Sequence, residues 1–362
     1  MEATTMHLHM PDQWQDHIND IMSSPGVTVV VGGIDAGKST FCALMSNYSL
    51  EKDVPSAVVD GDVGQSEIGP PTTIGMGLVN APIESLSDIE PHSLYFVGST
   101  SPVGHMLACT TGAKLLVEEA QALGRQLIIV DTTGLIRGSV ARRLKTHKIE
   151  LLHARHIIAL QRDDEAEHIL RFFDMSEDCT VHRLEISPFA RPKSQTLRMQ
   201  RRAAKFREYF RESQSFEIPL SSIATSGTWL RTGRLLEPKY LKFASTCLGV
   251  EVIHGEMVGR SVYLVTERDY NRRGTEEIEE EFGTNSVVVV SALRYASLVV
   301  GLMDKHLKLL ALGIVSSVDF RSKVLRVYTP LRSIMPVKSI RFGALKLRTD
   351  GTEIGRIRPG DV

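Results

Sequence analysis

The chain has 362 residues, with 42 Lys and Arg against 43 Asp and Glu, so its formal net charge is −1. A balanced charge excludes a polybasic protein of the histone type, although a local basic groove remains compatible with it. The length predicts two or three domains, and the four dispersed cysteines exclude a zinc-ribbon spacing and fit a reducing compartment.

The N-terminal segment, residues 1–24, carries Asp12, Asp16 and Asp20 and has no apolar core, so it does not have the pattern of a signal peptide. No run of 18 apolar residues occurs anywhere in the chain, which gives no candidate for a membrane span. We therefore expect a cytoplasmic protein that makes no contact with a membrane.

Residues 25–216 alternate between strand-like and helix-like patterns. Short β-branched runs that end in Gly or Asp are typical of buried parallel strands, and Ala- and Leu-rich stretches between them are typical of helices. This alternation predicts an α/β fold with a doubly wound parallel sheet, and the phosphate-binding loop described below predicts that it is of the P-loop NTPase type. The predicted strands are 27–31, 55–60, 93–97, 126–131 and 156–160, and the predicted helices are 38–47 and 107–123.

The pattern changes after residue 216, where alternating or apolar runs are separated by turns rich in Gly, Asp and Pro. Such a pattern predicts a smaller, β-rich C-terminal domain over residues 217–362. No catalytic motif is evident in it. The predicted strands are 261–265, 286–290, 311–315, 324–328 and 340–347.

A phosphate-binding loop follows the first predicted strand and opens the first predicted helix. Its sequence fits G-x-x-x-x-G-K-[ST], and its backbone N–H groups and helix N-terminus favour phosphate. Lys38 is expected to reach the β- and γ-phosphates of ATP, and the Ser39 hydroxyl to bind Mg²⁺. The nucleotide-binding residues are Gly32, Gly33, Ile34, Asp35, Ala36, Gly37, Lys38 and Ser39, with Thr40 next to them.

Three carboxylates follow strands that lead to the same edge of the predicted sheet. Asp60 and Asp62 end the second strand, and Asp131 ends an apolar strand in a Walker-B pattern. One of the first two carboxylates is predicted to hold Mg²⁺ and the other to accept a proton from an attacking hydroxyl. Asp131 is a rival for the metal, although a turn-capping role fits Asp131 and Thr132 equally well.

Residues 191–211 contain eight basic side chains and a single acid, Glu208. Read as a helix from about residue 194, the segment places Arg198, Arg201, Arg202 and Lys205 on one face. So many like charges destabilise a helix unless an anion neutralises them. In a phosphate-loop protein, the natural anions are ATP phosphates and a nucleic-acid backbone.

Taken together, these motifs resemble the polynucleotide 5′-hydroxyl kinase family, which includes the RNA kinase of messenger-RNA cleavage, ribosomal-RNA-processing kinases, and archaeal and bacterial relatives. The order of the motifs is more specific than the phosphate loop alone. The stretch 298–330 also resembles the terminal β-rich domain of that family. The matching segments are 32–40, 60–72, 96–105, 131–138 and 194–210.

The resemblance implies transfer of the γ-phosphoryl group of ATP, with Mg²⁺, to the 5′-hydroxyl of RNA, with DNA as a further acceptor. It identifies no protein partner. The catalytic residues that it implies are Lys38, Asp62 as general base, and the lid residues Lys193, Arg198 and Arg202. The substrate-binding residues are Gln65, Thr100, Ser101, Thr132, Thr133 and Gly134. The metal-binding residues are Ser39, Asp60 and Asp131.

Three departures from the family pattern bear on this interpretation. Leu135 stands where the family often has a stacking Trp, and Lys193 stands at a lid position where Arg would bind phosphate in bidentate fashion. Only 31 residues precede Gly32, so the N-terminal β-domain of eukaryotic members is not expected.

Two other classes of function remain open at this stage. A GTPase or regulatory ATPase switch would need only water in place of the acceptor, but the loop at residues 161–164 lacks the guanine-reading Asn-Lys-x-Asp motif. A non-catalytic, nucleotide-holding RNA-binding scaffold would fit the changes at Leu135 and Lys193.

Overall fold

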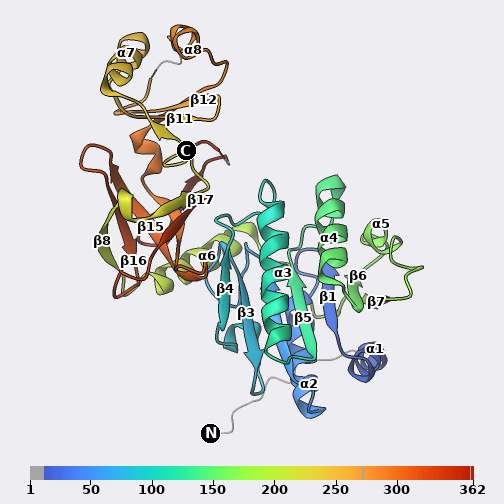
Figure 1. Ribbon diagram of the computed structural model, residues 1–362. Helices are drawn as coiled ribbons and strands as arrows, with labels where there is room; N and C mark the ends of the chain where they lie inside the picture. Colours follow the sequence, from blue (N-terminus) through green and yellow to red (C-terminus); the bar gives the residue numbers. More distant parts are fainter. Residues whose placement is uncertain (1–11, 271–272, 359) are drawn as a thin grey trace. The chain divides into compact units, whose positions relative to one another are not determined.

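The computed structural model describes residues 12–270, 273–358 and 360–362, and it divides into two compact units (Figure 1). The first unit ends at Arg202 and the second runs from Ala203 to Val362. The division falls inside helix α6 (Gln195–Tyr209), ahead of the domain boundary predicted at residue 216. The predicted N-terminal segment lies partly outside the described residues, and its described part contains helix α1 (Asp12–Ser23).

A seven-stranded sheet forms the centre of the first unit, in the order β4-β3-β2-β5-β1-β6-β7. The five strands from β2 to β7 in this order are parallel, and β3 and β4 add an antiparallel edge. The strands are β1 (Val27–Gly32), β2 (Ser56–Gly61), β3 (Thr73–Val79), β4 (Ser93–Phe96), β5 (Leu127–Thr132), β6 (His156–Gln161) and β7 (Thr180–Glu185).

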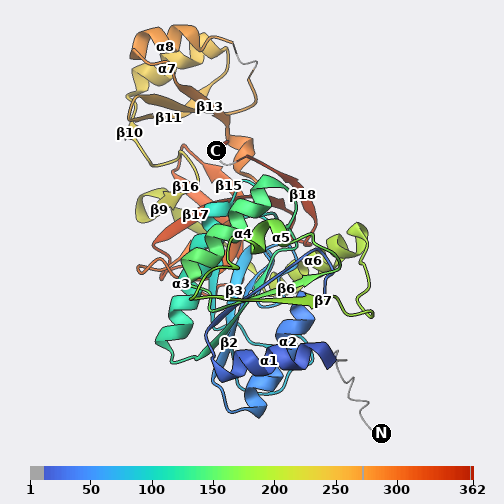
Figure 2. The same ribbon diagram turned by 90° about the vertical axis from the view of Figure 1, so that its right-hand side faces the viewer.

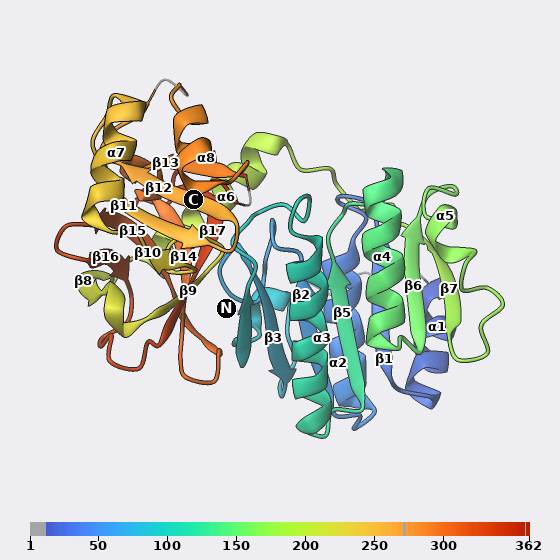
Figure 3. The same ribbon diagram turned by 45° about the horizontal axis from the view of Figure 1, so that its top comes forward.

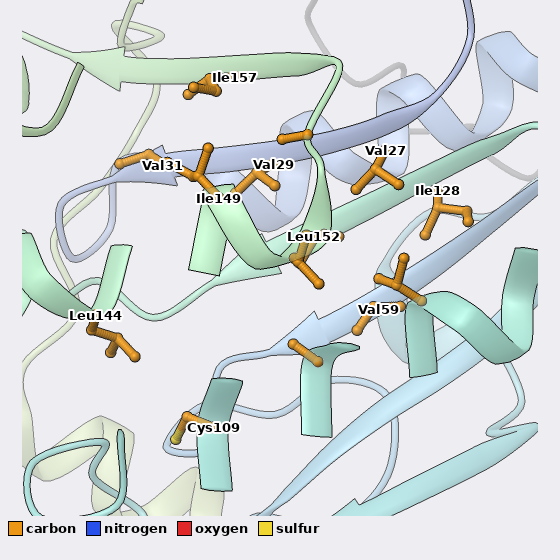
Figure 4. Close-up of a cluster of buried hydrophobic side chains, with 14 of the residues drawn as sticks. Val27, Val29, Val31, Val59, Cys109, Ile128, Leu144, Ile149, Leu152 and Ile157 are labelled. Carbon is orange, nitrogen blue, oxygen red and sulfur yellow. The ribbon is translucent and has the colours of Figure 1, made fainter. Parts of the chain in front are cut away.

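Helices cover both faces of this sheet, which confirms the predicted doubly wound α/β fold. Alternate residues of β1 point to opposite faces of the sheet. Val29 and Val31 belong to the core under α3 and α4 (Figures 3 and 4), and Val30 belongs to the core under α1 and α2. The helices are α2 (Lys38–Glu51), η1 (Leu86–Asp88), α3 (Met106–Ala122), α4 (Gly138–Leu152) and α5 (Glu167–Leu170).

The parallel register brings the ends of three strands together. Asp131 on β5 is the partner of Val30 on β1 and of Asp60 on β2, and Thr132 is the partner of Gly61. The carboxyl ends of parallel strands form the edge where ligands bind in open α/β sheets. The phosphate loop and the predicted acidic residues therefore share one edge.

The second unit is β-rich, as predicted, and its strands form two sheets. The larger, seven-stranded sheet has the order β18-β17-β14-β15-β16-β8, with β9 beside β17. It is built from β8 (Gln214–Pro219), β9 (Ala224–Ser226), β14 (Leu298–Met303), β15 (Leu309–Asp319), β16 (Val324–Thr329), β17 (Ser339–Leu347) and β18 (Glu353–Arg356).

The smaller sheet has the order β10-β11-β12-β13 and carries helices α7 and α8 (Figure 2). Buried residues Ala244 and Leu248 of α7 and Ile278 of α8 pack with Leu264 of this sheet. Among the described residues, no helix is both long and apolar enough to span a membrane. The elements are β10 (Arg234–Leu235), β11 (Val252–Val258), β12 (Ser261–Thr266), β13 (Val287–Ser291), α7 (Pro238–Leu248), α8 (Glu276–Phe282), η2 (Leu220–Ser222) and η3 (Ala292–Tyr295).

Candidate active site

The predicted nucleotide-binding residues 32–40 form the loop between β1 and α2. Gly37, with φ of 86°, precedes the first residue of α2, and this left-handed backbone favours glycine. The Lys38 side chain is buried, and its ammonium donates to the Gly33 carbonyl at 2.8 Å. The loop thus presents a helix N-terminus and one cation within a short stretch, which is the arrangement that phosphate groups favour.

Asp131 and Ser39 meet directly at the carboxyl end of β5. The Ser39 hydroxyl donates to Asp131 Oδ2 at 2.6 Å, and Asp131 is almost fully buried. Asp131 Oδ1 is buried without a hydrogen-bond partner among the described residues, and burial raises the pKa of this carboxyl. A hard divalent cation would satisfy both the unpaired oxygen and the buried charge, so these two residues fit Mg²⁺.

Asp60 anchors the loop that follows β2. Its Oδ1 accepts from the Asp62 backbone N–H at 3.0 Å, and its Oδ2 accepts from the N–H of Ile68 at 3.0 Å and from that of Glu67. Burial and the neighbouring Asp131 carboxylate raise the pKa of Asp60. The geometry therefore gives Asp60 a structural role, and its role as a metal ligand stays a prediction.

Asp62 differs from Asp60 in leaving one carboxylate oxygen available. Its Oδ1 accepts from the backbone N–H groups of Gly64 and Gln65, each at 3.1 Å, whereas Oδ2 makes no hydrogen bond within the described residues. The side chain is half-buried at the rim of the site. An oriented carboxylate with a free oxygen suits a general base. The Gln65 amide donates to the Gly64 carbonyl at 2.8 Å, and its contact with substrate stays a prediction.

The loop that carries Thr100 and Ser101 lies against the Asp62 loop. A Cβ on Gly64 would come within 2.8 Å of the Thr100 carbonyl oxygen, so only glycine allows this approach. Thr100 is nearly buried, and the Ser101 hydroxyl accepts from the Val103 N–H at 3.3 Å. The structure thus brings two predicted substrate-binding residues next to the predicted base.

The predicted substrate-binding segment Thr132 to Gly134, here called the clasp, lies beside the phosphate loop. A Cβ on Gly134 would lie 2.8 Å from Ile34 Cα, so these two loops are in close contact. The Thr132 hydroxyl points inward and donates to the Val30 carbonyl at 2.6 Å. The Thr133 hydroxyl is buried without a partner among the described residues. Thr133 is therefore better placed than Thr132 to bind a substrate group.

The lid residues meet the phosphate loop through Asp35. Arg198 Nη1 lies 2.9 Å from Asp35 Oδ2, and the Lys193 backbone N–H donates to the same oxygen at 2.8 Å. Asp35 is half-buried in the phosphate loop and has a left-handed backbone, with φ of 57°. Arg202 lies one helical turn beyond Arg198 and is half-buried. The structure thus brings Lys193 and Arg198 to the loop that would hold ATP.

Two buried lysines on α4, Lys145 and Lys148, were not identified from the sequence. The Lys145 ammonium donates to Thr132 Oγ1 at 2.5 Å and to the Thr133 carbonyl at 2.6 Å. Lys148 Nζ lies 3.4 Å from the position of a Cβ on Gly61, beneath the end of β2. Burial lowers the pKa of both lysines. Their signal in the sequence is spacing, since Lys145 lies seven residues and Lys148 four residues before the apolar position Leu152.

An open pocket of about 500 Å³ lies beside the clasp, where the loops after β5 and β6 meet. Its two arginines and one histidine suit a negatively charged group, and its two acids suit hydroxyl groups. This set is not apparent in the sequence, because its members come from the N-terminal end of α4 and from the segment that follows β6. The lining residues are Arg137, Gly138, Ser139, Arg142, Asp164, Glu165 and His168.

Comparison with known proteins identifies relatives over most of the chain. Residues 32–212 match the family model described as mRNA cleavage and polyadenylation factor CLP1 P-loop. A polyribonucleotide 5′-hydroxyl-kinase of Methanocaldococcus jannaschii is 33% identical over 332 residues, which is 90% of this chain and 88% of that protein. A polyribonucleotide 5′-hydroxyl-kinase of Pyrococcus abyssi is 31% identical over 334 residues, 92% of this chain and 91% of that protein.

Among solved structures, the fold is similar to that of Clp1p in the wild-type Clp1p–Pcf11p complex. The TM-score is 0.60 at 14% sequence identity, with 92% of this chain and 78% of that chain covered. This likeness concerns the fold alone. A protein described as a CLP1 homolog in Culex quinquefasciatus is 27% identical over 252 residues, 63% of this chain and 59% of that protein.

Proposed function

Because the chain belongs to the mRNA cleavage and polyadenylation factor CLP1 P-loop family, we propose that it is a polynucleotide 5′-hydroxyl kinase. The reaction transfers the γ-phosphoryl group of ATP to the 5′-hydroxyl of RNA, with DNA as a further acceptor. One observation supports this most directly. The carboxylate of Asp62, which has one oxygen without a hydrogen bond among the described residues, lies on the same sheet edge as the phosphate loop and the Ser39–Asp131 pair.

In the proposed mechanism, Asp62 Oδ2 accepts the proton of the 5′-hydroxyl. The 5′-oxygen then forms a bond to the γ-phosphorus, the bond from that phosphorus to the β–γ bridging oxygen breaks, and ADP leaves with the electron pair. Lys38 and Arg198 bind phosphate oxygens, and Thr133 and Gly134 hold the acceptor end. Catalysis consists mainly of positioning and of stabilising charge.

Mg²⁺ is part of this proposal, with Ser39 Oγ and Asp131 as the residues that would hold it. When bound, the ion neutralises charge on the transferred phosphoryl group. The unpaired Asp131 Oδ1 supports this assignment over Asp60, whose oxygens already accept backbone N–H groups. We also propose a cytoplasmic setting, which the free thiols of the four cysteines support.

The test incubates the purified chain with γ-labelled ATP, Mg²⁺ and short RNA and DNA oligonucleotides bearing a 5′-hydroxyl. We expect label on the oligonucleotide, none on an oligonucleotide already phosphorylated at its 5′ end, and none with Lys38→Ala. Asp62→Asn should lower kcat by about 10²- to 10⁴-fold while leaving ATP affinity unchanged. The matched control is Asp163→Asn, in an exposed loop, which should keep full activity.

Other outcomes would overturn the proposal in defined ways. Free labelled phosphate without labelled oligonucleotide would indicate an ATPase or GTPase switch, in which water replaces the acceptor. Bound nucleotide without any turnover would indicate a scaffold, and Leu135→Trp would then test whether the missing stacking side chain is the cause.

A further inference from the structure

Three histidines gather at the edge of the first unit's sheet that is opposite to the phosphate loop. His156 begins β6 beside Thr28 at the start of β1, whereas the phosphate loop follows the end of β1. His182 on β7 is the partner of Ile158, two residues beyond His156, so both rings point to the same face. Helix α1 covers that face and contributes His17, and both His156 and His182 are almost fully buried.

A hydrogen bond to a backbone carbonyl identifies the tautomer of His156. His156 Nε2 lies 2.9 Å from the Ser24 carbonyl oxygen, which can only accept, so His156 carries its proton on Nε2. In the neutral ring, Nδ1 is then a lone pair, and it lies 3.1 Å from His182 Nε2. His182 Nδ1 lies 3.1 Å from His17 Nδ1. A proton or a metal ion must therefore lie between His156 and His182.

A carboxylate completes a set of three ligand atoms. Asp20 Oδ2 lies 3.7 Å from His182 Nε2, and the ligand atoms of Asp20, His156 and His182 all lie within 4.8 Å of one another. Zinc bonds of about 2.0–2.2 Å in a tetrahedron place ligand atoms roughly 3.3–3.5 Å apart. The two observed separations of 3.1 and 3.7 Å lie on either side of that value.

The second ring nitrogens also match a metal site. Histidines that bind a metal almost always engage their other ring nitrogen with a carbonyl, carboxylate or similar group, which orients the ring. Here the Ser24 carbonyl holds His156, and His17 holds His182. Imidazole ligands favour zinc over magnesium or calcium.

We propose that His156 Nδ1, His182 Nε2 and Asp20 Oδ2 form a zinc site that joins α1 to β6 and β7. A water molecule from the solvent side supplies the fourth ligand, because the Asp20 side chain is 56% exposed. The site lies at the opposite ends of the strands from the phosphate loop. It is independent of the proposed kinase activity.

The experiment uses the untagged chain, which is stripped of metal with a chelator and then kept in excess Mg²⁺. Magnesium then competes for the carboxylates beside the phosphate loop. Titration with Co²⁺ should give the visible absorption of a tetrahedral ion, and Zn²⁺ should bind at one equivalent with a Kd below about 10 μM. Asp20→Asn and His182→Gln should each weaken binding at least about tenfold. The control is His147→Gln, at a ring that is 72% exposed on α4.

Two results would overturn the proposal. One is the absence of Zn²⁺ binding in the wild-type chain, which would leave a proton between the rings. The other is binding that Asp20→Asn and His182→Gln leave unchanged. Because Asp20 is exposed, Asp20→Asn keeps the fold even if His182→Gln does not. Added Zn²⁺ should raise the Tm of the wild-type chain and not that of Asp20→Asn.

Discussion

At the scale of single residues, two buried lysines interact electrostatically with the carboxylates at the sheet edge that holds the candidate site. Asp60 and Asp131 are almost fully buried, and burying a charge is costly unless an opposite charge is near. Burial lowers the pKa of Lys145 and Lys148, and the charges of Asp62 and Asp131 oppose this effect by raising it. The electrostatics of the site therefore depend on α4, an element that contains none of the predicted site residues.

Lys145→Met tests whether this lysine positions the clasp. The substitution removes the donor to the Thr132 hydroxyl and the Thr133 carbonyl. Losing about 1.4 kcal/mol at the clasp raises KM for the oligonucleotide about tenfold. KM for ATP should not change, and Lys114→Met on α3 is the matched control. An equal rise in both KM values would mean that the substitution disturbs the whole site rather than the clasp.

A pH effect is expected at Glu167, where the Arg183 side chain lowers the pKa to about 2. A carboxylate whose pKa is lowered on folding stabilises the fold above its unfolded pKa of about 4.5, and this contribution is lost as the pH falls toward 2. The ion pair is partly exposed, so its contribution is at most about 1 kcal/mol.

NMR titration of the side-chain carboxyl carbons checks this value. The midpoint of Glu167 should lie near 2 in the wild-type chain and return toward 4.5 in Arg183→Met. The stability difference between the two proteins should be larger at neutral pH than in acid. A midpoint that does not move would show that Arg183 is not the cause.

At the scale of elements, the contact between the loops of Asp62 and Thr100 depends on one glycine. In Gly64→Ala, the new methyl group would lie 2.8 Å from the Thr100 carbonyl, so the loops must separate. Overpacking of this kind costs roughly 1–3 kcal/mol, and misplacement of the base should lower kcat about 10²-fold. Gly355→Ala in β18 has open space around its Cβ and should match the wild-type chain in denaturant midpoint and in kcat.

Much of the first unit follows from local sequence patterns. The predicted strands 27–31, 126–131 and 156–160 agree with β1, β5 and β6 to within a residue at each end, because buried parallel strands are continuous apolar runs. Strand β7 was missed because its burial alternates, and α1 because its apolar side chains face a sheet that is distant in sequence.

The candidate site could be predicted only where its chemistry lies in contiguous motifs. The pairing of Ser39 with Asp131, 92 residues apart, follows from motif knowledge, because each residue has a fixed place after its strand. The contact of Asp35 with Arg198 joins residues 163 apart, and no local pattern specifies it. Helix α7 in the second unit was likewise not among the elements predicted for the β-rich C-terminal domain.

At the scale of the whole molecule, two units with separate hydrophobic cores predict unfolding in more than one step. Calorimetry should show two transitions. ADP with Mg²⁺ at about 100 times its Kd stabilises the first unit by about 2.7 kcal/mol, which raises its transition by roughly 5–10 °C. The second transition should stay in place, and Lys38→Ala should abolish the shift. A single transition that moves as a whole would show that the units unfold together.

The bonding of Asp60 changes what an inactive variant at that position would mean. Its carboxylate holds the backbone of Asp62, Glu67 and Ile68, so replacing it releases the segment that carries the base. In a genetic screen, substitutions of Asp60 would abolish activity as substitutions of catalytic residues do. The cause would be the loss of order in the loop and not the loss of a catalytic group. Selection would keep Asp60 even in a descendant that had abandoned metal-dependent chemistry, as long as that descendant still used the loop.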